Sequence, residues 1–121
     1  MSAETALFAA LSGAPAVTAI VGAGAATRIY PDVVPQEIEL PAVAFLRGAT
    51  EYVHTLSALA VDQRATLDVI CLAETRLAAE QLGDAVEAAC VSARQPPASR
   101  RADYDHENGI WATVLTVDVW Q

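Results

Sequence analysis

The side chains most suggestive of chemistry are a histidine and its acidic neighbours close to the C-terminus. His106 stands among Asp103, Asp105 and Glu107, and an imidazole beside carboxylates can form a metal site or a tuned acid–base group. Residues that alternate along a strand point to opposite faces of a sheet, so these side chains are not expected to converge on one point. A solvated acidic hairpin tip is the favoured interpretation over a metal site.

A glycine-containing segment near residue 22 has part of a dinucleotide-binding fingerprint. The full fingerprint places three glycines before a helix, where they let the backbone approach a pyrophosphate. Gly22 and Gly24 are present, but Thr27 occupies the third glycine position and residues 28–31 follow, with Pro31, where the helix should begin. The segment therefore indicates a flexible loop of glycine and alanine rather than a nucleotide site.

The candidate nucleophiles lack the partners that would activate them. All seven basic residues are arginine, which excludes Schiff-base and P-loop lysine chemistry. Cys71 and Cys90 have apolar neighbours and no nearby histidine, so both are predicted to be buried free thiols rather than a disulfide or a metal pair. His54 stands alone, and no serine lies in a Gly-x-Ser-x-Gly motif. The sequence predicts no catalytic, cofactor-binding or metal-binding residues, and a protein that is not an enzyme.

The composition favours a small protein that buries surface against partners. Its 121 residues suffice for one domain, which we assign to residues 1–121. Hydrophobic residues form 54% of the chain and charged residues 18%, against about 25% charged in an average globular protein. We therefore expect some apolar surface to meet a partner.

Charge and hydropathy argue against two further classes of protein. The net charge is −8 and the arginines are scattered, with only Arg100 and Arg101 adjacent, which is unlike a nucleic-acid-binding surface. No run approaches the ~20 apolar residues of a membrane-spanning helix. The N-terminal segment carries Glu4 instead of the basic start of a signal peptide. A soluble protein made in the cytoplasm is expected.

Three segments have the pattern of helices. The first runs from Ser2, a candidate N-cap, to Ser12, and the second runs from Pro15 to Val21. The third and clearest covers residues 74–92 and has an apolar stripe along one side. The stripe consists of Leu77 or Ala78 together with Leu82, Val86, Ala89 and Cys90.

Strand patterns occupy most of the remaining chain. They cover residues 42–53, 64–72, 99–107 and 110–121, with at most a short strand at 28–30. A long connection from about Tyr52 to Asp62 joins the first pair, and Asn108-Gly109 predicts a two-residue hairpin turn in the second. Hairpins with helices set apart predict an α+β fold, with an antiparallel sheet of about four strands and two main helices packed on one face.

The final strand is apolar on both faces. Leu115 and Val117 belong to one face, and Ala112 and Val114 belong to the other. One layer of helices can cover only one of them. The second apolar face favours an oligomer, although a central strand beneath additional loops would show the same pattern.

Several segments together resemble a known family. They are AETALFAALSGAPAVTAIVG at 3–22, RIYPDVVPQ at 28–36, LPAV at 40–43, and RATLDVICLAET at 64–75 before an alanine- and leucine-rich helix. Their order, and the spacing from RIYP to LP, resemble the tail-completion (tail-terminator) proteins of long-tailed bacteriophages and gene-transfer particles. The resemblance covers most of the chain, while the region after Gln95 matches in general character only.

The resemblance implies a structural virion protein without catalytic residues. It implies an α+β subunit that forms a ring, hexameric in characterised relatives, at the head-proximal end of the tail tube. There the ring would end tail polymerisation and offer a surface to the head–tail connector. Its partners would be other copies of itself, the major tail tube protein and the connector. The implied location is the tail neck of a virion assembled in the host cytoplasm, with DNA passing through the lumen without specific binding.

Two sets of residues are candidates for contacts in such a ring. Leu56, Leu59 and Val61 are apolar within the long connection, which is too irregular for the core and would be ordered by a neighbouring subunit or the tube. Acidic residues either let a polyanion pass the lumen without holding it or only keep an apolar monomer soluble. The acidic candidates for the inner wall or rim are Glu37, Glu39, Asp103, Asp105 and Glu107.

A second interpretation belongs to a different class of protein. A small dimeric α+β binding domain could hold an apolar ligand or a protein partner on the second sheet face, or in a cleft beneath the long connection. It would share the same composition. The sequence alone leaves both interpretations open.

Overall fold

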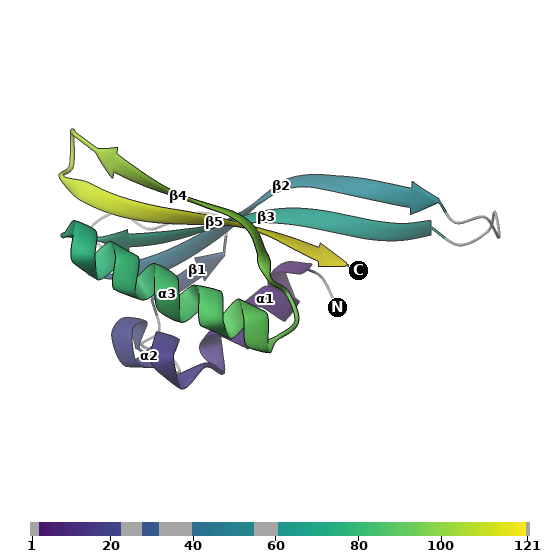
Figure 1. The fold of residues 1–121 in the computed structure, drawn as a ribbon, viewed down its shortest axis with the longest axis horizontal. Helices are drawn as coiled ribbons and strands as arrows, with labels where there is room; N and C mark the ends of the chain where they lie inside the picture. The colour runs from purple at the N-terminus through teal and green to yellow at the C-terminus, as the bar shows by residue number, and fades with distance from the viewer. Residues whose placement is uncertain (1–2, 23–27, 32–39, 55–60, 121) are drawn as a thin grey trace.

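The chain folds into a sheet with helices on one of its faces, as a computed structural model shows (Figure 1). The structure describes residues 3–22, 28–31, 40–54 and 61–120, and it places side chains for residues 5–22, 28–30, 40–46 and 65–119. The described residues form three helices and a five-stranded sheet. In chain order the elements are α1 (Ala3–Ser12), α2 (Pro15–Val21), β1 (Ile29–Pro31), β2 (Ala42–His54), β3 (Val61–Ala73), α3 (Arg76–Ser92), β4 (Pro97–Asp105) and β5 (Ile110–Trp120).

The helix boundaries follow local signals in the sequence. Pro15 starts α2, and Gly22 ends it with a φ of 89°, which glycine adopts without strain. The Thr75 hydroxyl accepts a 3.1 Å hydrogen bond from the Ala78 amide and caps α3. The three predicted helices are thus confirmed, while Ser2, the expected N-cap of the first, lies outside the described residues.

The strands lie in the order β1-β2-β3-β5-β4. Neighbouring strands are antiparallel except β1 and β2, which pair in parallel with Ile29 opposite Val43. The predicted α+β class is confirmed, but the expected sheet of about four strands gains a fifth at one edge. A strand of three residues has too short a side-chain pattern to predict its pairing, and only the ladder to β2 defines it.

The β2–β3 hairpin is longer than the sequence indicated. β2 continues to His54 and β3 begins at Val61, and these two residues are opposite each other in the register. The expected long connection from Tyr52 to Asp62 is therefore wrong at both ends, and residues 55–60 separate the strands. Backbone pairing defines a strand even where the side-chain pattern is irregular, so Val61 belongs to a strand rather than to a loop.

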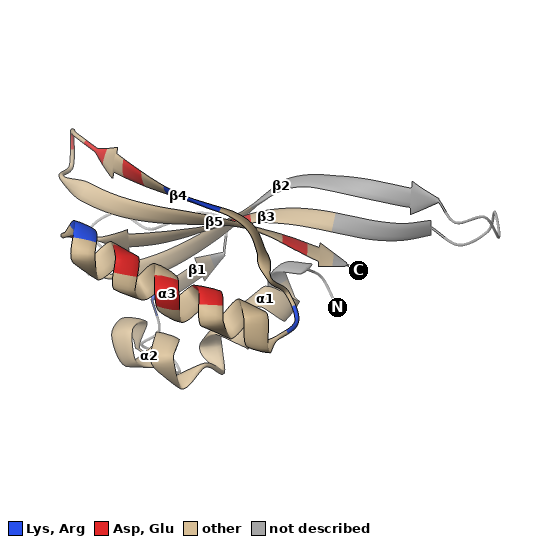
Figure 2. Cartoon of the chain, in the orientation of Figure 1, with Lys and Arg blue, Asp and Glu red and all other residues tan. Residues whose placement is uncertain are grey.

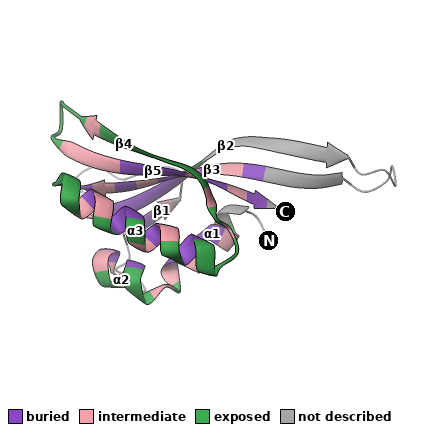
Figure 3. Cartoon of the chain, in the orientation of Figure 1, coloured by how far each residue is buried: buried purple, intermediate pink, exposed green. Residues whose placement is uncertain are grey.

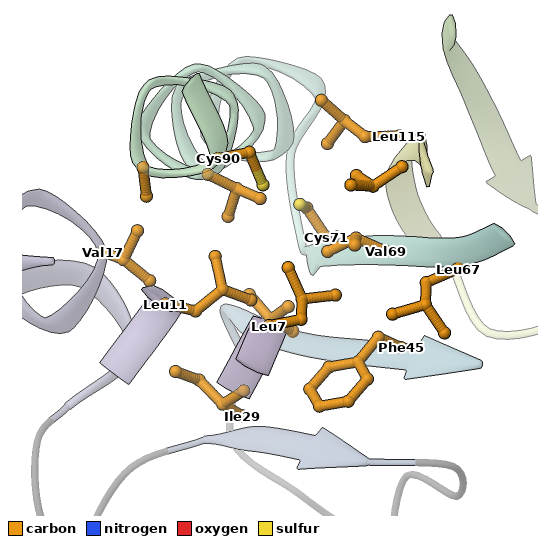
Figure 4. Packing of buried hydrophobic residues seen from close by; sticks show 14 of the residues in the cluster. Leu7, Leu11, Val17, Ile29, Phe45, Leu67, Val69, Cys71, Cys90 and Leu115 are labelled. Atoms are coloured by element: carbon orange, nitrogen blue, oxygen red, sulfur yellow. The ribbon is translucent and has the colours of Figure 1, made fainter. Parts of the chain in front are cut away.

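The core lies between the helices and the sheet face that they cover (Figure 4). Side chains from α1 and α2 meet those of the central strands there, and Phe45 and Leu67 are fully buried. α3 approaches β5 closely, since a Cβ added to Gly83 would lie 2.7 Å from Cγ2 of Thr113. The Thr113 hydroxyl also donates a 3.1 Å hydrogen bond to the Ala79 carbonyl. Close packing and a buried hydrogen bond therefore hold α3 on the sheet.

The β4–β5 hairpin closes with a four-residue turn instead of the expected two-residue turn at Asn108-Gly109. Asp105 ends β4 and is paired with Ile110, the first residue of β5. The Asp105 carboxylate accepts hydrogen bonds from the Glu107 amide at 3.0 Å and from the Asn108 side-chain amide at 2.8 Å. An aspartate that accepts hydrogen bonds from the residues two and three positions later stabilises the longer turn. Gly109 completes the turn with a φ of 66°.

Candidate functional site

The sheet face opposite the helices has no helix packed on it within the described residues (Figures 1 and 3). Ile70 on β3 lies between Ala44 on β2 and Val114 on β5 in the register, so apolar side chains line up across three strands. The alternation predicted for the final strand, β5, is confirmed here, and β3 alternates in the same way. We call this surface the open face, and its described apolar members are Ala42, Ala44, Leu46, Ile70, Leu72, Ile110, Ala112 and Val114.

The polar part of the open face is already hydrogen-bonded within the sheet. Thr66 donates a 3.0 Å hydrogen bond to Asp118, and Thr116 donates one of 3.0 Å to Asp68. Both are directly opposed pairs of the β3–β5 register. Because each of these two carboxylates has a partner on the next strand, the pairs stabilise the sheet and leave this part of the face without strong demand for a metal or a cation.

A shallow hollow of about 380 Å³ lies on the open face beside the β4–β5 turn. Its apolar lining comes from β3 and β5, and includes Ile70, Leu72 and Ala112. Its charged lining comes from the edge strand β4, which contributes Asp103, Asp105 and Arg101. The hollow therefore combines an apolar floor with a side that carries two carboxylates and one guanidinium, a composition suited to an apolar side chain with a neighbouring positive charge.

The acidic β4–β5 turn brings together three predicted site residues. Asp103, Asp105 and Glu107 are all exposed, and Figure 2 shows acidic residues gathered at this end of the hairpin. Hydrogen bonds from Asn108 and from the Glu107 amide lower the pKa of Asp105 below its usual value. His106 packs edge-on against Tyr104 at 4.8 Å between ring centroids. No group of three potential metal-binding side chains occurs among the described residues.

The two cysteines are buried and free, as the sequence predicted. Burial raises the pKa of Cys71 to about 12 and that of Cys90 to about 11. A thiol with so high a pKa is almost wholly protonated near neutral pH, and the thiolate is the reactive species. Neither cysteine is therefore placed to act as a nucleophile or a metal ligand.

The remaining predicted site residues are placed only in part. Val61 starts β3, in a strand instead of the expected connection, and its side chain is outside the described set. Leu56, Leu59, Glu37 and Glu39 lie outside the described residues. Their assignment to an interface or to the lumen stays a prediction.

Sequence reasoning missed two exposed apolar side chains on α3. Leu77, which was one option for the apolar stripe, is 65% exposed, and Val91 is 56% exposed. Ala79 and Gly83 are buried in the stripe instead, because small residues let the helix approach β5. Past the helix end, Arg94 has a φ of 61° and forms no ion pair with any described residue. Helical spacing places Leu77 and Val91 away from the buried stripe, and this spacing was the sequence signal that could have predicted their exposure.

Arg100 belongs to the covered face and is neutralised there. Its guanidinium is 2.8 Å from the Asp84 carboxylate and 3.2 Å from that of Glu87, both on α3. Arg101, the next residue, lines the hollow on the open face. Adjacent arginines on an edge strand thus face opposite sides of the sheet, which the alternation of a strand requires. Arg100 and Arg101 therefore do not form a single basic patch.

The described helices are also too short or too polar to cross a membrane. This finding concerns α1, α2 and α3, the longest of which covers Arg76–Ser92.

Comparisons with known proteins cover nearly the whole chain. The family model described as tail completion protein gp17 matches residues 5–121, and thus includes the region after Gln95. Among solved structures, a chain of the "Virion of native gene transfer agent (GTA) particle" is 15% identical and superposes with a TM-score of 0.74. That match covers 98% of this chain and 93% of the other, and at this identity it shows a shared fold. No curated protein matches the chain.

Proposed function

Because this chain belongs to the tail completion protein gp17 family, we propose that it caps the head-proximal end of a phage tail tube as a ring of six copies. In this role it ends polymerisation of the tube and provides the surface to which the head attaches. The observation that carries the proposal is the family match over residues 5–121. The coarser conclusion, a structural component of a phage-type tail and virion, follows directly from membership of the family.

The surface of the subunit supports assembly with other copies. A ring is built from heterologous contacts, in which each subunit presents two different patches to its two neighbours. The open face carries a row of apolar side chains, of which Leu46 is exposed and Ile70 and Leu72 are half-buried. The outer side of α3 presents the exposed side chains of Leu77 and Val91 among charged residues. These surfaces lie on opposite sides of the sheet (Figure 1), as a head-to-tail contact needs.

The partners in this role are other copies of the chain, the major tail tube protein and the head–tail connector. Our candidates for contacts with a neighbouring subunit or the tube are Leu56, Leu59 and Val61. The ring is assembled in the host cytoplasm and sits at the neck of the tail. We assign it no catalytic activity and no cofactor.

The lumen of the ring must let DNA pass without binding it. A lumen lined by arginine would hold phosphates and slow transit, whereas carboxylates would not. We therefore place acidic residues at the inner wall or rim. The candidates are Glu37 and Glu39 together with Asp103, Asp105 and Glu107 of the β4–β5 turn.

The test is to produce particles without this protein and to add the purified chain back. The proposal expects tails of irregular, often excessive length and separate DNA-filled heads, and complete particles after addition of the protein. Electron microscopy measures tail length and head attachment. Tails of normal length joined to heads in the absence of the protein would overturn the proposed function.

A further inference from the structure

We infer that neighbouring copies in the ring contact each other head to tail, with Val91 and Arg94 of one copy seated in the hollow on the open face of the next. This inference rests on the proposed function and assigns the surfaces that build its ring. We call Val91 and Arg94, at the C-terminal end of α3, the α3 knob.

The lining of the hollow is complementary to a partner that has both an apolar side chain and a positive charge. Its floor is formed by apolar side chains of β3 and β5, while Asp103 and Asp105 stand on its β4 side. Neither carboxylate forms an ion pair within the described residues, and the single guanidinium of Arg101 leaves an excess of negative charge. A partner with an exposed apolar side chain beside a cation would match both properties.

The α3 knob has these two properties on the same subunit. Val91 is 56% exposed, and the Arg94 amide donates a 3.0 Å hydrogen bond to the Val91 carbonyl, so the two residues are joined in one turn. Arg94 makes no ion pair within the described residues. A buried contact with Asp103 or Asp105 of the next copy would supply its missing partner.

The other large apolar side chain exposed on α3, Leu77, fits the hollow less well. Leu77 is 65% exposed, but its neighbour Arg76 is already paired with Glu80 at 3.1 Å. Arg76 also lies 6.0 Å from the ring centre of Trp111, at the same end of the molecule as the hollow. Leu77 is therefore close to the hollow's own end of the subunit, and serves as a matched control on the same helix.

The separation of the two patches favours a ring rather than a closed pair. α3 runs from Arg76, beside the β4–β5 turn, to Ser92 at the other end (Figure 1). At 1.5 Å per residue its length is roughly 25 Å. The knob and the hollow thus occupy opposite ends and opposite faces of the subunit. Contact between them joins unlike surfaces and leaves both outer surfaces free for further copies.

This contact divides the acidic residues of the β4–β5 turn between an interface with the neighbouring copy and the lumen. Asp103 and Asp105 line the hollow and face the neighbouring copy, whereas Glu107 is not part of the hollow's lining. Glu107, with Glu37 and Glu39, remains the candidate for the lumen. The hairpin then lies where an interface between copies reaches the rim of the ring.

A double cysteine variant, Val91→Cys with Ala112→Cys, tests the contact on purified tails that carry the protein. Ala112 lines the hollow, and burial with raised pKa keeps the native Cys71 and Cys90 out of the reaction. Mild oxidation is expected to give a ladder of covalent oligomers that ends at the copy number of the ring. The control variant, Leu77→Cys with Ala112→Cys, should stay monomeric on a denaturing gel.

The outcomes separate this inference from the proposed function. Complete particles with no ladder, with a product that stops at dimer, or with equal cross-linking of the Leu77 control would overturn the contact and leave the proposed function standing. Absence of the protein from tails would overturn both.

Charge exchange gives an independent test that needs no cross-link. Arg94→Glu should raise the protein concentration needed for tail completion at least about tenfold, because like charges then face each other across the interface. Arg94→Glu with Asp103→Arg should recover most of this loss, while the control Arg76→Glu should have little effect. Failure of the exchanged pair to recover, with both single variants folded by circular dichroism, would contradict the proposed contact.

Discussion

The two faces of the sheet are built from the same strands but have different tasks. Phe45 and Leu46 are adjacent on β2, yet Phe45 is fully buried under the helices and Leu46 is 40% exposed on the open face. On the covered face, a close helix crossing and a buried hydrogen bond complete the packing. On the open face, cross-strand hydrogen bonds satisfy the Thr and Asp side chains of β3 and β5, while Ile70 and Leu72 remain half-buried.

This difference separates the residues that fold the subunit from those available for assembly. The covered face excludes water from its side chains, so a substitution that removes packing there is expected to unfold the subunit. The open face can remain in contact with water in a single copy because Asp68 and Asp118, its half-buried carboxylates among the described side chains, each have a hydroxyl partner. The apolar groups of such a surface contribute binding free energy only when another chain removes them from water.

The largest expected effect contrasts the two neighbouring residues on β2. Phe45→Ala should destabilise the subunit by about 3–5 kcal/mol, because it removes a fully buried aromatic ring and leaves a cavity. Leu46→Ala should cost less than about 1 kcal/mol, since its side chain is already partly in water. Urea unfolding followed by circular dichroism measures both. Equal losses would show that the open face contributes to the monomer core.

The next effect examines the close crossing of α3 over β5. Gly83→Ala gains up to about 1 kcal/mol in helix propensity, but the added Cβ would lie 2.7 Å from Cγ2 of Thr113. We expect a net loss of about 1–2 kcal/mol from this overpacking. Thr113→Ser removes Cγ2 and keeps the hydroxyl that bonds to Ala79, so it should relieve the effect of Gly83→Ala. A more stable Gly83→Ala variant would mean that α3 lies farther from the sheet.

The sequence predicted the periodic parts of the fold better than its contacts. The helices and the alternation of β5 were predicted correctly because spacing alone determines which side chains share a face. The pairing of β1 and the true length of the β2–β3 hairpin depend on backbone hydrogen bonds between distant residues, which no local pattern contains. The four-residue turn after Asp105 was missed because the hydrogen bonds of the Asp105 side chain favour it over the two-residue turn that Asn108-Gly109 predicts.

The candidate site was predictable in character but not in location. An apolar second face and an acidic hairpin follow from the residues of β4 and β5. The hollow that joins them exists only because β4 pairs with β5 and brings Asp103 opposite Ala112. Likewise, the exposure of Val91 depends on how α3 is rotated, which the buried Gly83 determines.

A smaller effect compares the adjacent arginines of β4. Arg100 bridges Asp84 and Glu87 on α3 and donates a 3.2 Å hydrogen bond to the Glu80 carbonyl. Arg100→Ala should therefore destabilise the subunit by about 0.5–1 kcal/mol, less at high salt, because the acidic partners are exposed.

Arg101→Ala, its control on the open face, should leave stability unchanged within about 0.5 kcal/mol. Thermal unfolding at low and high salt measures both variants. A salt-independent loss for Arg100→Ala would show that its packing, rather than its charge, attaches β4 to the helix.

The smallest effect concerns the pH dependence of the β4–β5 turn. Asp105 accepts hydrogen bonds in its charged form, and these lower its pKa in the folded state. A group with a lowered folded-state pKa stabilises the fold above its unfolded value and loses that contribution as pH falls through the folded value. Stability of the turn should therefore be constant near neutral pH and decline only in acid, below the usual pKa of an aspartate. An NMR titration should show Asp105 protonating at a pH below the usual pKa of an aspartate, and in Asp105→Ala the amides of Glu107 and Asn108 should lose their acid-sensitive shifts. Protonation of Asp105 at the usual pKa of an aspartate would show that its carboxylate does not hold the turn, and that the Asn108-Gly109 sequence determines it after all.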